Sequence, residues 1–415
     1  MIRLGKQFAE QYKDRDPKWG FNGLGYIVYK RTYAREKPNG KLEEWWETVL
    51  RVVNGMQTVA GGEYTETDLE TLYDNIFNLR CFPSGRGLWQ LGTKNVEEKL
   101  LGVSLLNCWF VKIDSINAFT MAFNWLMSGG GVGFSIQRKY IYELPVIKTG
   151  VTVSHIKSND ADFITPDSRA GWVATLRKIL DSFFVTGESF TYSTVVVRAR
   201  GEKVAGYGGL AAGPQVLVDG LAKIINIIQT RKGKKLRSID CLDIMCLISE
   251  IIQGSNTRRG AMISIGDCDD SLYLKAKRWD LGSIPSYRAY VNCTVDVKDT
   301  ADLSPIFWEG YEGKGEPYGL ISIDTAQTIA RIGDIKFDSA EGANPCQRSD
   351  STVLTPEGIS TIGRIGVGDT IWSGKQWTKV VNKWHTGVKP VYEFRTTRSR
   401  FIGTENHEVF QRGIK

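Results

Sequence analysis

Cys and His are the residues of this sequence that we consider first as candidates for catalysis or metal binding. The 415 residues include seven Cys and three His. His155 is the only His before residue 346, so a Ser–His–Asp triad cannot be assembled in that part of the chain. Cys241 and Cys246 lie five positions apart on an expected helix and point about 140° away from each other, which excludes a shared metal ion. We therefore interpret these two cysteines as core residues.

The remaining cysteines give no metal-binding pattern. Cys108 stands in the stretch 104–110, whose apolar pattern is typical of a buried strand. Taken alone, this pattern favours a buried core thiol over a redox group. Cys81, Cys268 and Cys293 have no partner at the spacing of metal ligands. We expect no separate metal site.

A glycine cluster covers residues 129–135, with the sequence Gly-Gly-Gly-Val-Gly-Phe-Ser. A phosphate-binding P-loop needs Lys after its last Gly, but Phe134 stands there, and the spacing also fails the dinucleotide fingerprint. The cluster therefore favours a tight passage of the backbone over a nucleotide site. In this cluster and in a similar one at 206–209, the missing Cβ atoms would let the backbone approach a ligand closely.

Composition narrows the class of protein. A chain of this length, with 42% hydrophobic and 24% charged residues, can bury a large core, which excludes a disordered tail, a collagen-like rod and a disulfide-stapled miniprotein. The sequence lacks an apolar run of about 18 residues and an apolar signal-peptide core. An odd number of irregularly spaced Cys is typical of reduced thiols in a cytosol. We therefore expect a soluble, cytoplasmic enzyme without membrane contact.

The elements that must position these groups follow an α/β pattern before residue 346. Segments with helical spacing of apolar residues are 42–53, 67–79 and 238–251. Strand-like runs are 193–197, 261–265 and 320–323. Thr65 or Thr67 is the expected N-cap of the second helix.

The sequence changes character near Cys346. From there to the end, 11 Lys or Arg against 6 Asp or Glu supply +5 of the net charge of +7. Short β-rich pieces replace the helical patterns, namely 352–354, 369–372, 388–394 and 409–410. These features predict a small all-β module. Because its positive charges are scattered among strands, we do not expect it to bind nucleic acid.

Ten short motifs stand in an order that is more specific than any one of them. They are Trp-Gly at 19–20, Tyr-Lys-Arg-Thr-Tyr-Ala-Arg at 29–35, Pro-Ser-Gly-Arg-Gly-Leu-Trp at 83–89, Asn-Cys-Trp-Phe at 107–110, the glycine cluster at 129–135, Pro-Asp-Ser-Arg-Ala-Gly-Trp at 166–172, Gly-Tyr-Gly-Gly at 206–209, Arg-Arg at 258–259, Gly-Glu-Pro at 315–317 and Asn-Pro-Cys at 344–346. In this order they resemble the adenosylcobalamin-dependent (class II) ribonucleotide reductases, especially the monomeric ribonucleoside-triphosphate type.

The resemblance implies an enzyme that replaces the 2′-hydroxyl of a ribonucleotide with hydrogen by thiyl-radical chemistry. Adenosylcobalamin would be its cofactor, a ribonucleoside triphosphate its substrate and a thioredoxin-like protein its reductant. Cys108 matches one member of the reducing dithiol, and Asn344 matches a residue that contacts the substrate ribose. Pro83, Ser84 and Asn107 would line the substrate cleft.

The implied fold is a ten-stranded α/β barrel with the radical cysteine on a finger loop inside it. Residues 1–90 would form a mainly helical region and residues 91–345 the first half of the barrel. The second half, the second reducing cysteine and most of the cobalamin site have no counterpart in this sequence. Such a chain would not reduce a ribonucleotide alone.

Directly after the last motif the sequence departs from the family. Where the family continues with Gly-Glu, this chain has Gln347 and Arg348, and the Arg removes the proton carrier that a catalytic Glu would supply. The residues that follow resemble the N-terminal part of an intein, a Hint-type module. The similar blocks are an opening block at 346–358, a strand pair at 365–371 and a Thr-x-x-His block at 403–407.

In the reductase family Cys346 matches the position of the radical cysteine, but the intein resemblance implies that it is the nucleophile of a self-catalysed reaction. Its thiol would attack the carbonyl of Pro345 and replace the peptide bond with a thioester. His407, assisted by Thr404, would donate a proton to the departing amide nitrogen. The reaction would need no cofactor, but its completion would need a C-terminal intein–reductase half that acts in trans.

The sequence thus predicts a helical region at 1–90, a half-barrel at 91–345 and an N-terminal intein fragment at 346–415. Two alternatives remain open. One is an unspliced or degenerate fragment that only binds nucleotide or partner chains. The other is a Hint-type module that cleaves itself without ligation.

Overall fold

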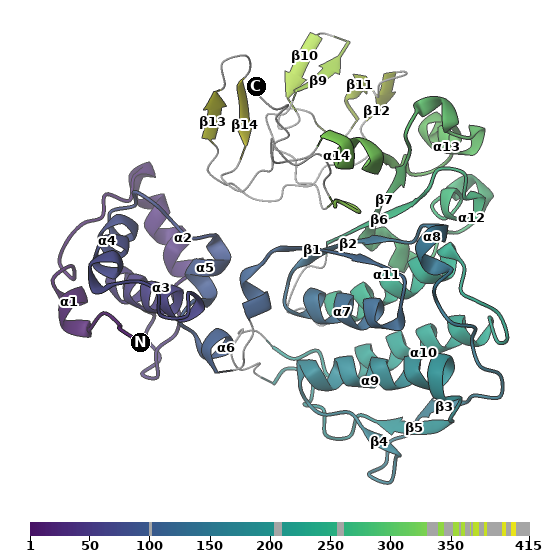
Figure 1. Ribbon diagram of the computed structural model, residues 1–415, viewed down its shortest axis with the longest axis horizontal. Helices are drawn as coiled ribbons and strands as arrows, with labels where there is room; N and C mark the ends of the chain where they lie inside the picture. Colours follow the sequence, from purple (N-terminus) through teal and green to yellow (C-terminus); the bar gives the residue numbers. More distant parts are fainter. Residues whose placement is uncertain are drawn as a thin grey trace.

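The computed structural model describes most of the chain before residue 344 and separate short stretches after it. The described residues are 1–98, 102–202, 210–254, 261–329, 339–343, 352–356, 358–361, 366, 368–372, 377–379, 392–395 and 400–403. They form an N-terminal group of helices, a large parallel sheet with helices against it, a small parallel sheet and three hairpins (Figure 1).

The N-terminal region is helical. Its helices are α1 (Lys6–Glu10), α2 (Leu24–Thr32), α3 (Trp45–Val59), α4 (Glu66–Phe77), α5 (Gly85–Gln90) and α6 (Lys94–Glu97). Helices α3 and α4 confirm the two predicted at 42–53 and 67–79. Thr65, not Thr67, is the N-cap of α4, because its hydroxyl accepts a hydrogen bond from the backbone N–H of Asp68.

The main sheet is parallel and five-stranded. Its strands, in spatial order, are β1 (Cys108–Lys112), β2 (Gly131–Ser135), β6 (Met262–Asp267), β7 (Val291–Asp296) and β8 (Gly319–Ile321). Every pairing between neighbours is parallel. Parallel strands need crossover connections, which here include helices α7 (Ile116–Met127), α10 (Gln215–Gln229) and α11 (Ser238–Gly254). The chain therefore has the α/β architecture that its sequence predicts.

A smaller parallel sheet lies between β2 and β6 in the sequence. Its order is β3 (Val153–His155), β5 (Phe190–Ser193) and β4 (Phe163–Ile164). The other helices are α8 (Arg138–Ile141), α9 (Arg169–Asp181), α12 (Ser271–Leu274), α13 (Pro305–Glu309) and α14 (Ile323–Ile329). Short helical turns are η1 (Phe21–Gly23), η2 (Gly102–Leu105), η3 (Ser182–Thr186), η4 (Trp279–Leu281), η5 (Ser286–Tyr290), η6 (Thr300–Asp302) and η7 (Gly310–Lys314).

The three predicted strands have different outcomes. The strand predicted at 261–265 is confirmed as β6. The strand predicted at 320–323 is β8 in its first part, but α14 already begins at Ile323. The strand predicted at 193–197 is wrong, since β5 ends at Ser193 and the N–H of Val197 turns back to donate to the carbonyl of Thr194.

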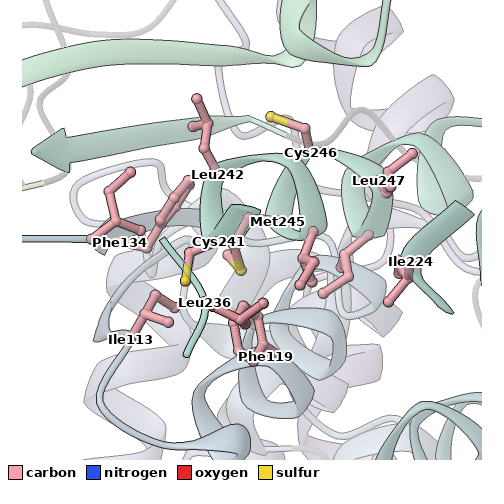
Figure 2. Packing of buried hydrophobic residues seen from close by; sticks show 14 of the residues in the cluster. Ile113, Phe119, Phe134, Ile224, Leu236, Cys241, Leu242, Met245, Cys246 and Leu247 are labelled. Carbon is pink, nitrogen blue, oxygen red and sulfur yellow. The ribbon is translucent and has the colours of Figure 1, made fainter. Parts of the chain in front are cut away.

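Helix α11 is the centre of the sheet core, the cluster of buried residues between Ile113 and Tyr318. Cys241 and Cys246 are fully buried, as predicted, and Figure 2 shows their sulfur atoms on opposite sides of the helix. Burial raises the pKa of both thiols well above the usual value, so neither is a nucleophile at neutral pH. None of the helices in the described part of the chain is long and apolar enough to cross a membrane.

The described residues after 343 form antiparallel hairpins. They pair β9 (Thr352–Thr355) with β10 (Gly358–Thr361), β11 (Thr370–Trp372) with β12 (Trp377–Lys379), and β13 (Tyr392–Arg395) with β14 (Arg400–Gly403). The β pieces predicted at 352–354 and 369–372 are confirmed as β9 and β11. Strand β13 confirms the end of the piece predicted at 388–394, and the piece predicted at 409–410 lies outside the described residues.

Candidate functional site

Cys108 is the first residue of β1, and its side chain is exposed. The prediction of a buried thiol is therefore wrong. The physical reason is its position, because β1 is an edge strand of the sheet and Cys108 lies at the amino end of that strand. Asn107 precedes it, and its carbonyl accepts a hydrogen bond of 2.7 Å from the N–H of Gly131 at the start of β2. An exposed thiol at a fixed strand end is accessible to a substrate or to another thiol.

The glycine cluster at 129–135 is a tight backbone passage, as predicted. A Cβ at Gly130 would lie 2.7 Å from the ring of Trp109, which stacks on Trp125 with a centroid distance of 4.7 Å. A Cβ at Gly133 would lie 2.7 Å from the carbonyl oxygen of Ala343. Glycine at these two positions thus admits an indole on one side and a second stretch of backbone on the other.

That second stretch is the segment 339–343, which we call the approach segment. Lys112 on β1 pairs with Glu341 at 2.9 Å, and hydrogen bonding to Glu341 raises the pKa of the Lys112 ammonium group. The side-chain amide of Gln327 donates to the carbonyl of Ala340 at 2.7 Å. Gly342 lies so close to the ring of Phe110 that a Cβ would overlap it. The approach segment is therefore held against β1 and β2 directly before residue 344.

Pro83 and Ser84 lie at the start of α5. Ser84 is the N-cap of the helix, with its hydroxyl accepting from the N–H of Gly87 at 3.1 Å. A Cβ at Gly87 would lie 2.8 Å from Cβ of Pro83, so glycine permits the helix to fold back onto the proline.

Arg86 connects α5 to the turn before β2. Its guanidinium donates to the carbonyls of Ser128, at 2.8 Å, and Gly129. Ser128 is the C-cap of α7, where the helix dipole favours a cation. A third contact, at 3.4 Å, reaches the carbonyl of Ser104 in η2. Arg86 thereby fixes the Pro83–Ser84 segment relative to the strand pair that carries Cys108.

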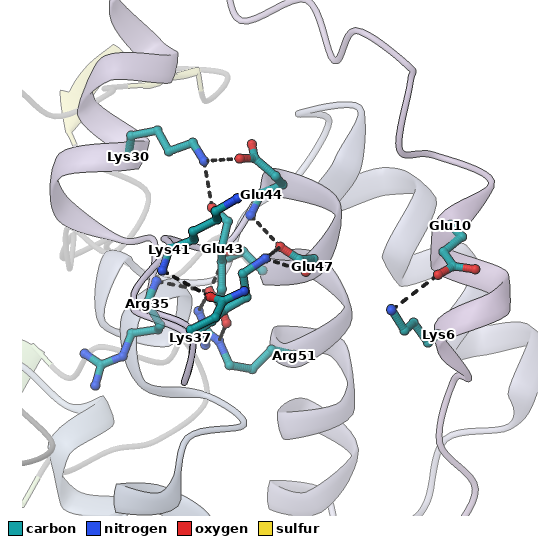
Figure 3. A network of polar contacts seen from close by, with 12 residues as sticks. Lys6, Glu10, Lys30, Arg35, Lys37, Lys41, Glu43, Glu44, Glu47 and Arg51 are labelled. Carbon is teal, nitrogen blue, oxygen red and sulfur yellow. Dashed lines mark hydrogen bonds and ion pairs between the residues drawn. The ribbon is translucent and has the colours of Figure 1, made fainter.

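A buried ion pair fixes the other end of α5. Arg51 on α3 donates to both carboxylate oxygens of Glu43, at 2.8 and 3.0 Å (Figure 3). It also donates to the carbonyls of Leu88 and Leu91. The Glu43 carboxylate also accepts from the hydroxyl of Thr48 at 2.7 Å. Glu43 is only 8% exposed. A buried charge pair with this many hydrogen bonds defines one geometry, so α5 is anchored at both ends.

Two open cavities lie beside these elements. One, of about 290 Å³, is lined by Met56, Val59, Ala60, Tyr64, Pro83, Ser84, Gly87, Leu91 and Leu105. The other, of about 250 Å³, is lined by Phe110, Val111, Lys112, Asp114, Ser115, Ala118, Met121, Trp125 and Glu341. The first includes both residues of the Pro83–Ser84 segment, and the second includes the ion pair of the approach segment.

The structure places only part of the predicted site. Cys108, Asn107, Pro83 and Ser84 are described and are linked through Arg86, β1 and β2. Asn344, Cys346, Thr404 and His407 lie outside the described residues. Among the described residues, no group of three or more His, Cys, Asp or Glu side chains could hold a metal ion.

Sequence reasoning missed three positioning residues, namely Arg86, Lys112 and Glu341. Arg86 stands inside the motif at 83–89, so the sequence could have pointed to it. Its partners are backbone carbonyls of residues distant in the sequence, and no sequence pattern predicts such contacts. Lys112 and Glu341 lie 229 positions apart, and no local pattern links them.

Comparison with known proteins gives matches to one family. Residues 4–93 match the ribonucleotide reductase alpha domain, and residues 144–228 match the insertion domain of B12-dependent ribonucleotide reductase. Adenosylcobalamin-dependent ribonucleoside-triphosphate reductases of Lactobacillus acidophilus and Lactobacillus leichmannii are 30% and 31% identical to this chain, over alignments of 414 and 411 positions. Each match covers 83% of this chain and 55% of the relative.

A more distant organism and a solved structure give the same result. A probable adenosylcobalamin-dependent ribonucleoside-triphosphate reductase of Dictyostelium discoideum is 30% identical over an alignment of 374 positions, and the match covers 83% of this chain and 49% of that protein. The crystal structure of a B12-dependent (class II) ribonucleotide reductase matches with a TM-score of 0.66 and 27% identity, covering 81% of this chain and 54% of its own. The chain thus spans about half the length of the relatives that it matches.

Proposed function

We propose that this chain, which corresponds to the N-terminal region of the class II, adenosylcobalamin-dependent ribonucleotide reductases, is the first part of a ribonucleoside-triphosphate reductase. One observation carries the proposal. The exposed Cys108 opens β1, while the approach segment that leads to Asn344 and Cys346 lies against β1 and β2. The same two strands thus position the proposed reducing thiol and the chain next to the proposed radical position.

The proposed roles follow from the net reaction. Replacement of the 2′-hydroxyl by hydrogen releases water and needs two electrons, which a dithiol supplies as it becomes a disulfide. Cys108 is the proposed member of that dithiol on this chain. Asn344 is proposed to bind the ribose, and Pro83, Ser84 and Asn107 to line its cleft. A thioredoxin-like protein would reduce the disulfide again.

The cofactor is proposed to be adenosylcobalamin, held mainly by protein outside this chain. The two cavities described above, of about 250 and 290 Å³, are no larger than the small end of the range for drug-sized ligands, about 300–1,000 Å³. A corrin ring with its adenosyl group does not fit in them. We therefore assign no residue of this chain to the cofactor.

The main sheet is proposed to be one half of a ten-stranded barrel. Its outer strands, β1 and β8, each have one neighbour in the sheet of the described residues. Exposed strand edges need a partner or a cover. We propose that a second half, present in the relatives beyond the matched part, pairs there.

The region after residue 345 is proposed to be the N-terminal part of an intein. Three antiparallel hairpins support an all-β module there. The relatives match 83% of the chain, which leaves about 70 of the 415 residues outside the match, as many as follow Pro345. Arg348 stands where the family resemblance implies a catalytic Glu, at the point where the proposed intein begins.

The proposed splicing step forms a thioester. Sγ of Cys346 loses its proton and attacks the carbonyl carbon of Pro345, the C–N bond breaks, and the freed amine takes a proton from His407, which Thr404 assists and which the thiol proton restores. Cys346 would then leave with the intein. The radical cysteine of the mature enzyme would be the first residue of the downstream segment, ligated to Pro345.

Intact-mass analysis of the protein in its source cells tests both parts. An antibody to residues 1–345 should isolate a species well above 46.4 kDa whose junction peptide reads Asn-Pro-Cys-Gly-Glu. Recovery of only the 46.4 kDa chain, still reading Asn-Pro-Cys-Gln-Arg, would show an unspliced fragment without reductase activity.

A test on the purified chain isolates the first step. Dithiothreitol should release residues 1–345 from the wild-type chain, and Cys346→Ala should abolish the release. Cys108→Ala is the matched control, because it removes an exposed thiol but should leave cleavage unchanged. Equal cleavage of wild type and Cys346→Ala would disprove the thioester. Cleavage without any ligated product in cells would favour the self-cleaving module.

A further inference from the structure

Helix α2 presents an apolar stripe to solvent. Leu24, Ile27 and Val28 are 56%, 61% and 36% exposed. With Arg31 they occupy positions i, i+3, i+4 and i+7, so they lie on one face of the helix. We call these four residues the α2 stripe. Singly exposed apolar residues are common on proteins, but a contiguous apolar face marks a site of interaction.

The opposite face of α2 is firmly attached. Tyr29 is 3% exposed, stacks on Trp19 with a centroid distance of 5.4 Å and donates its hydroxyl to the carbonyl of Glu43 at 2.9 Å. Lys30 pairs with Glu44 at 2.7 Å. A Cβ at Gly25 would lie 2.8 Å from the carbonyl oxygen of Trp19, so glycine lets the helix approach that close. The helix cannot turn to hide its stripe.

The stripe also has a defined charge. Arg31 is exposed at its end and makes no ion pair within the described part of the chain. A complementary surface would be apolar and would carry a carboxylate opposite Arg31.

The identity of the covering surface follows from the length of the relatives. Helix α2 lies inside the residues that match the ribonucleotide reductase alpha domain, so it belongs to the reductase part of the chain. The match accounts for only 55% of the relative from Lactobacillus acidophilus. The remaining 45% is large enough to cover an apolar face that the first part leaves exposed.

We infer that the α2 stripe is a docking surface for the downstream half of the reductase, through an apolar strip that carries an acidic residue. This inference rests on the proposed function. It gives α2 a role in the association of the two halves. This role is distinct from the pairing at the sheet edges and from the ligation at the splice junction.

Site-specific cross-linking in the source cells tests the inference on the full chain. Ile27 is replaced by photoreactive p-benzoylphenylalanine, and the same replacement at Leu281, which is 60% exposed in η4, is the matched control. Cross-linked peptides are identified by mass spectrometry. We expect position 27, but not position 281, to form cross-links to peptides of the downstream reductase half.

A charge variant gives a second readout. Leu24→Lys together with Ile27→Lys should lower the recovery of the assembled two-half protein by about tenfold or more, because burying the new charges is costly. The near-ultraviolet circular dichroism of the aromatic cluster around Tyr29 should not change. Leu281→Lys should leave assembly unchanged.

The other outcomes separate this inference from the proposed function. Cross-links from position 27 to a second copy of the same chain would overturn the inference. Assembly of the two halves without such cross-links, or with the charge variant unaffected, would also overturn it and leave the reductase proposal intact. Absence of any assembled or spliced species in the cells would overturn both.

Discussion

The two hydrophobic cores of this protein are built differently. The helical core, the buried residues between Leu4 and Leu91, is rich in Tyr and Trp side chains, and three of them, Tyr29, Trp45 and Tyr73, donate to backbone carbonyls. Trp45 donates to the carbonyl of Phe77 at 3.0 Å, and Tyr73 donates to that of Trp46 at 2.9 Å. The sheet core around α11 consists mainly of close-packed aliphatic side chains. Its hydrogen-bonded aromatic residues include Tyr273 and Tyr318, which donate to the carbonyls of Ser264 and Tyr273.

The difference between the two cores shows how each region holds the candidate site residues in place. A small helical region has less apolar area to bury, so directional hydrogen bonds contribute more to its unique geometry. That geometry fixes the carboxyl end of α5, while Arg86 ties the amino end, and hence the Pro83–Ser84 segment, to the turn before β2. The sheet core instead supports the strand pair that carries Cys108 and the approach segment.

Removing the buried cation from the helical core should have the largest effect. Arg51→Met leaves the Glu43 carboxylate buried without its partner, which we expect to lower the free energy of unfolding by about 3–5 kcal/mol. Urea denaturation followed by tryptophan fluorescence measures the change. Arg80→Met is the control, because the Arg80–Asp74 pair is exposed and should contribute less than about 1 kcal/mol. Equal effects of both variants would show that the buried Arg51–Glu43 pair contributes no more to the stability of the helical core than an exposed pair does.

Truncation in the sheet core should come next. Leu247→Ala on α11 removes a fully buried side chain and leaves a cavity, with an expected loss of about 3 kcal/mol. The same denaturation experiment measures it. Leu281→Ala, at an exposed position, should be nearly neutral. A loss below about 1 kcal/mol for Leu247→Ala would show that the core around α11 collapses to fill the space.

Removal of the N-cap of α4 tests how much a single hydrogen bond at the edge of the helical core contributes to stability. Thr65→Ala removes the side-chain cap of α4 and should cost about 1 kcal/mol. Thr67→Ala should be neutral or slightly stabilising, because Thr67 lies inside the helix, where Ala is the better former. Thermal unfolding of both variants would show the order. The reverse order would assign the cap to Thr67.

The smallest expected effect is a pH dependence at the margin of the sheet core. Burial, together with the charge of Lys157, lowers the pKa of His155 below its ordinary value of 6.5. The unfolded chain then binds more protons than the folded chain near and below that pH, so stability should fall as the pH drops below 6.5. His155→Gln should remove this component. Unfolding midpoints measured at pH 7.5 and pH 5.5 give the comparison, and an unchanged difference in the variant would exclude His155 as its source.

The sequence predicted those parts of the fold that depend on local patterns. Helices α3, α4 and α11 follow apolar periodicity, and β6 follows a short apolar run. The run 193–197 failed because residues with strand preference form a turn after β5. The turn depends on the hydrogen bond from the N–H of Val197 to the carbonyl of Thr194, which strand propensity does not predict.

The site was less predictable than the fold. The order of the motifs predicted that Cys108 and the Pro83–Ser84 segment belong to the site. It did not predict which residues surround them. The exposure of Cys108 depends on which strand lies at the edge of the sheet, and this is a property of topology. Arg86 and Lys112 act on partners far away in the sequence, which a single sequence does not disclose.

The ion pair between Lys112 and Glu341 also affects the order in which parts of the chain fold. Its partners are separated by 229 positions, and a contact that closes so long a loop forms late in folding. On a ribosome that adds about 5–20 residues per second, Glu341 emerges roughly 10 to 50 s after Lys112. Strands β1, β2, β6 and β7 can therefore assemble before the approach segment arrives. The order of synthesis itself makes the chain next to Cys346 the last part of the sheet region to reach its final position.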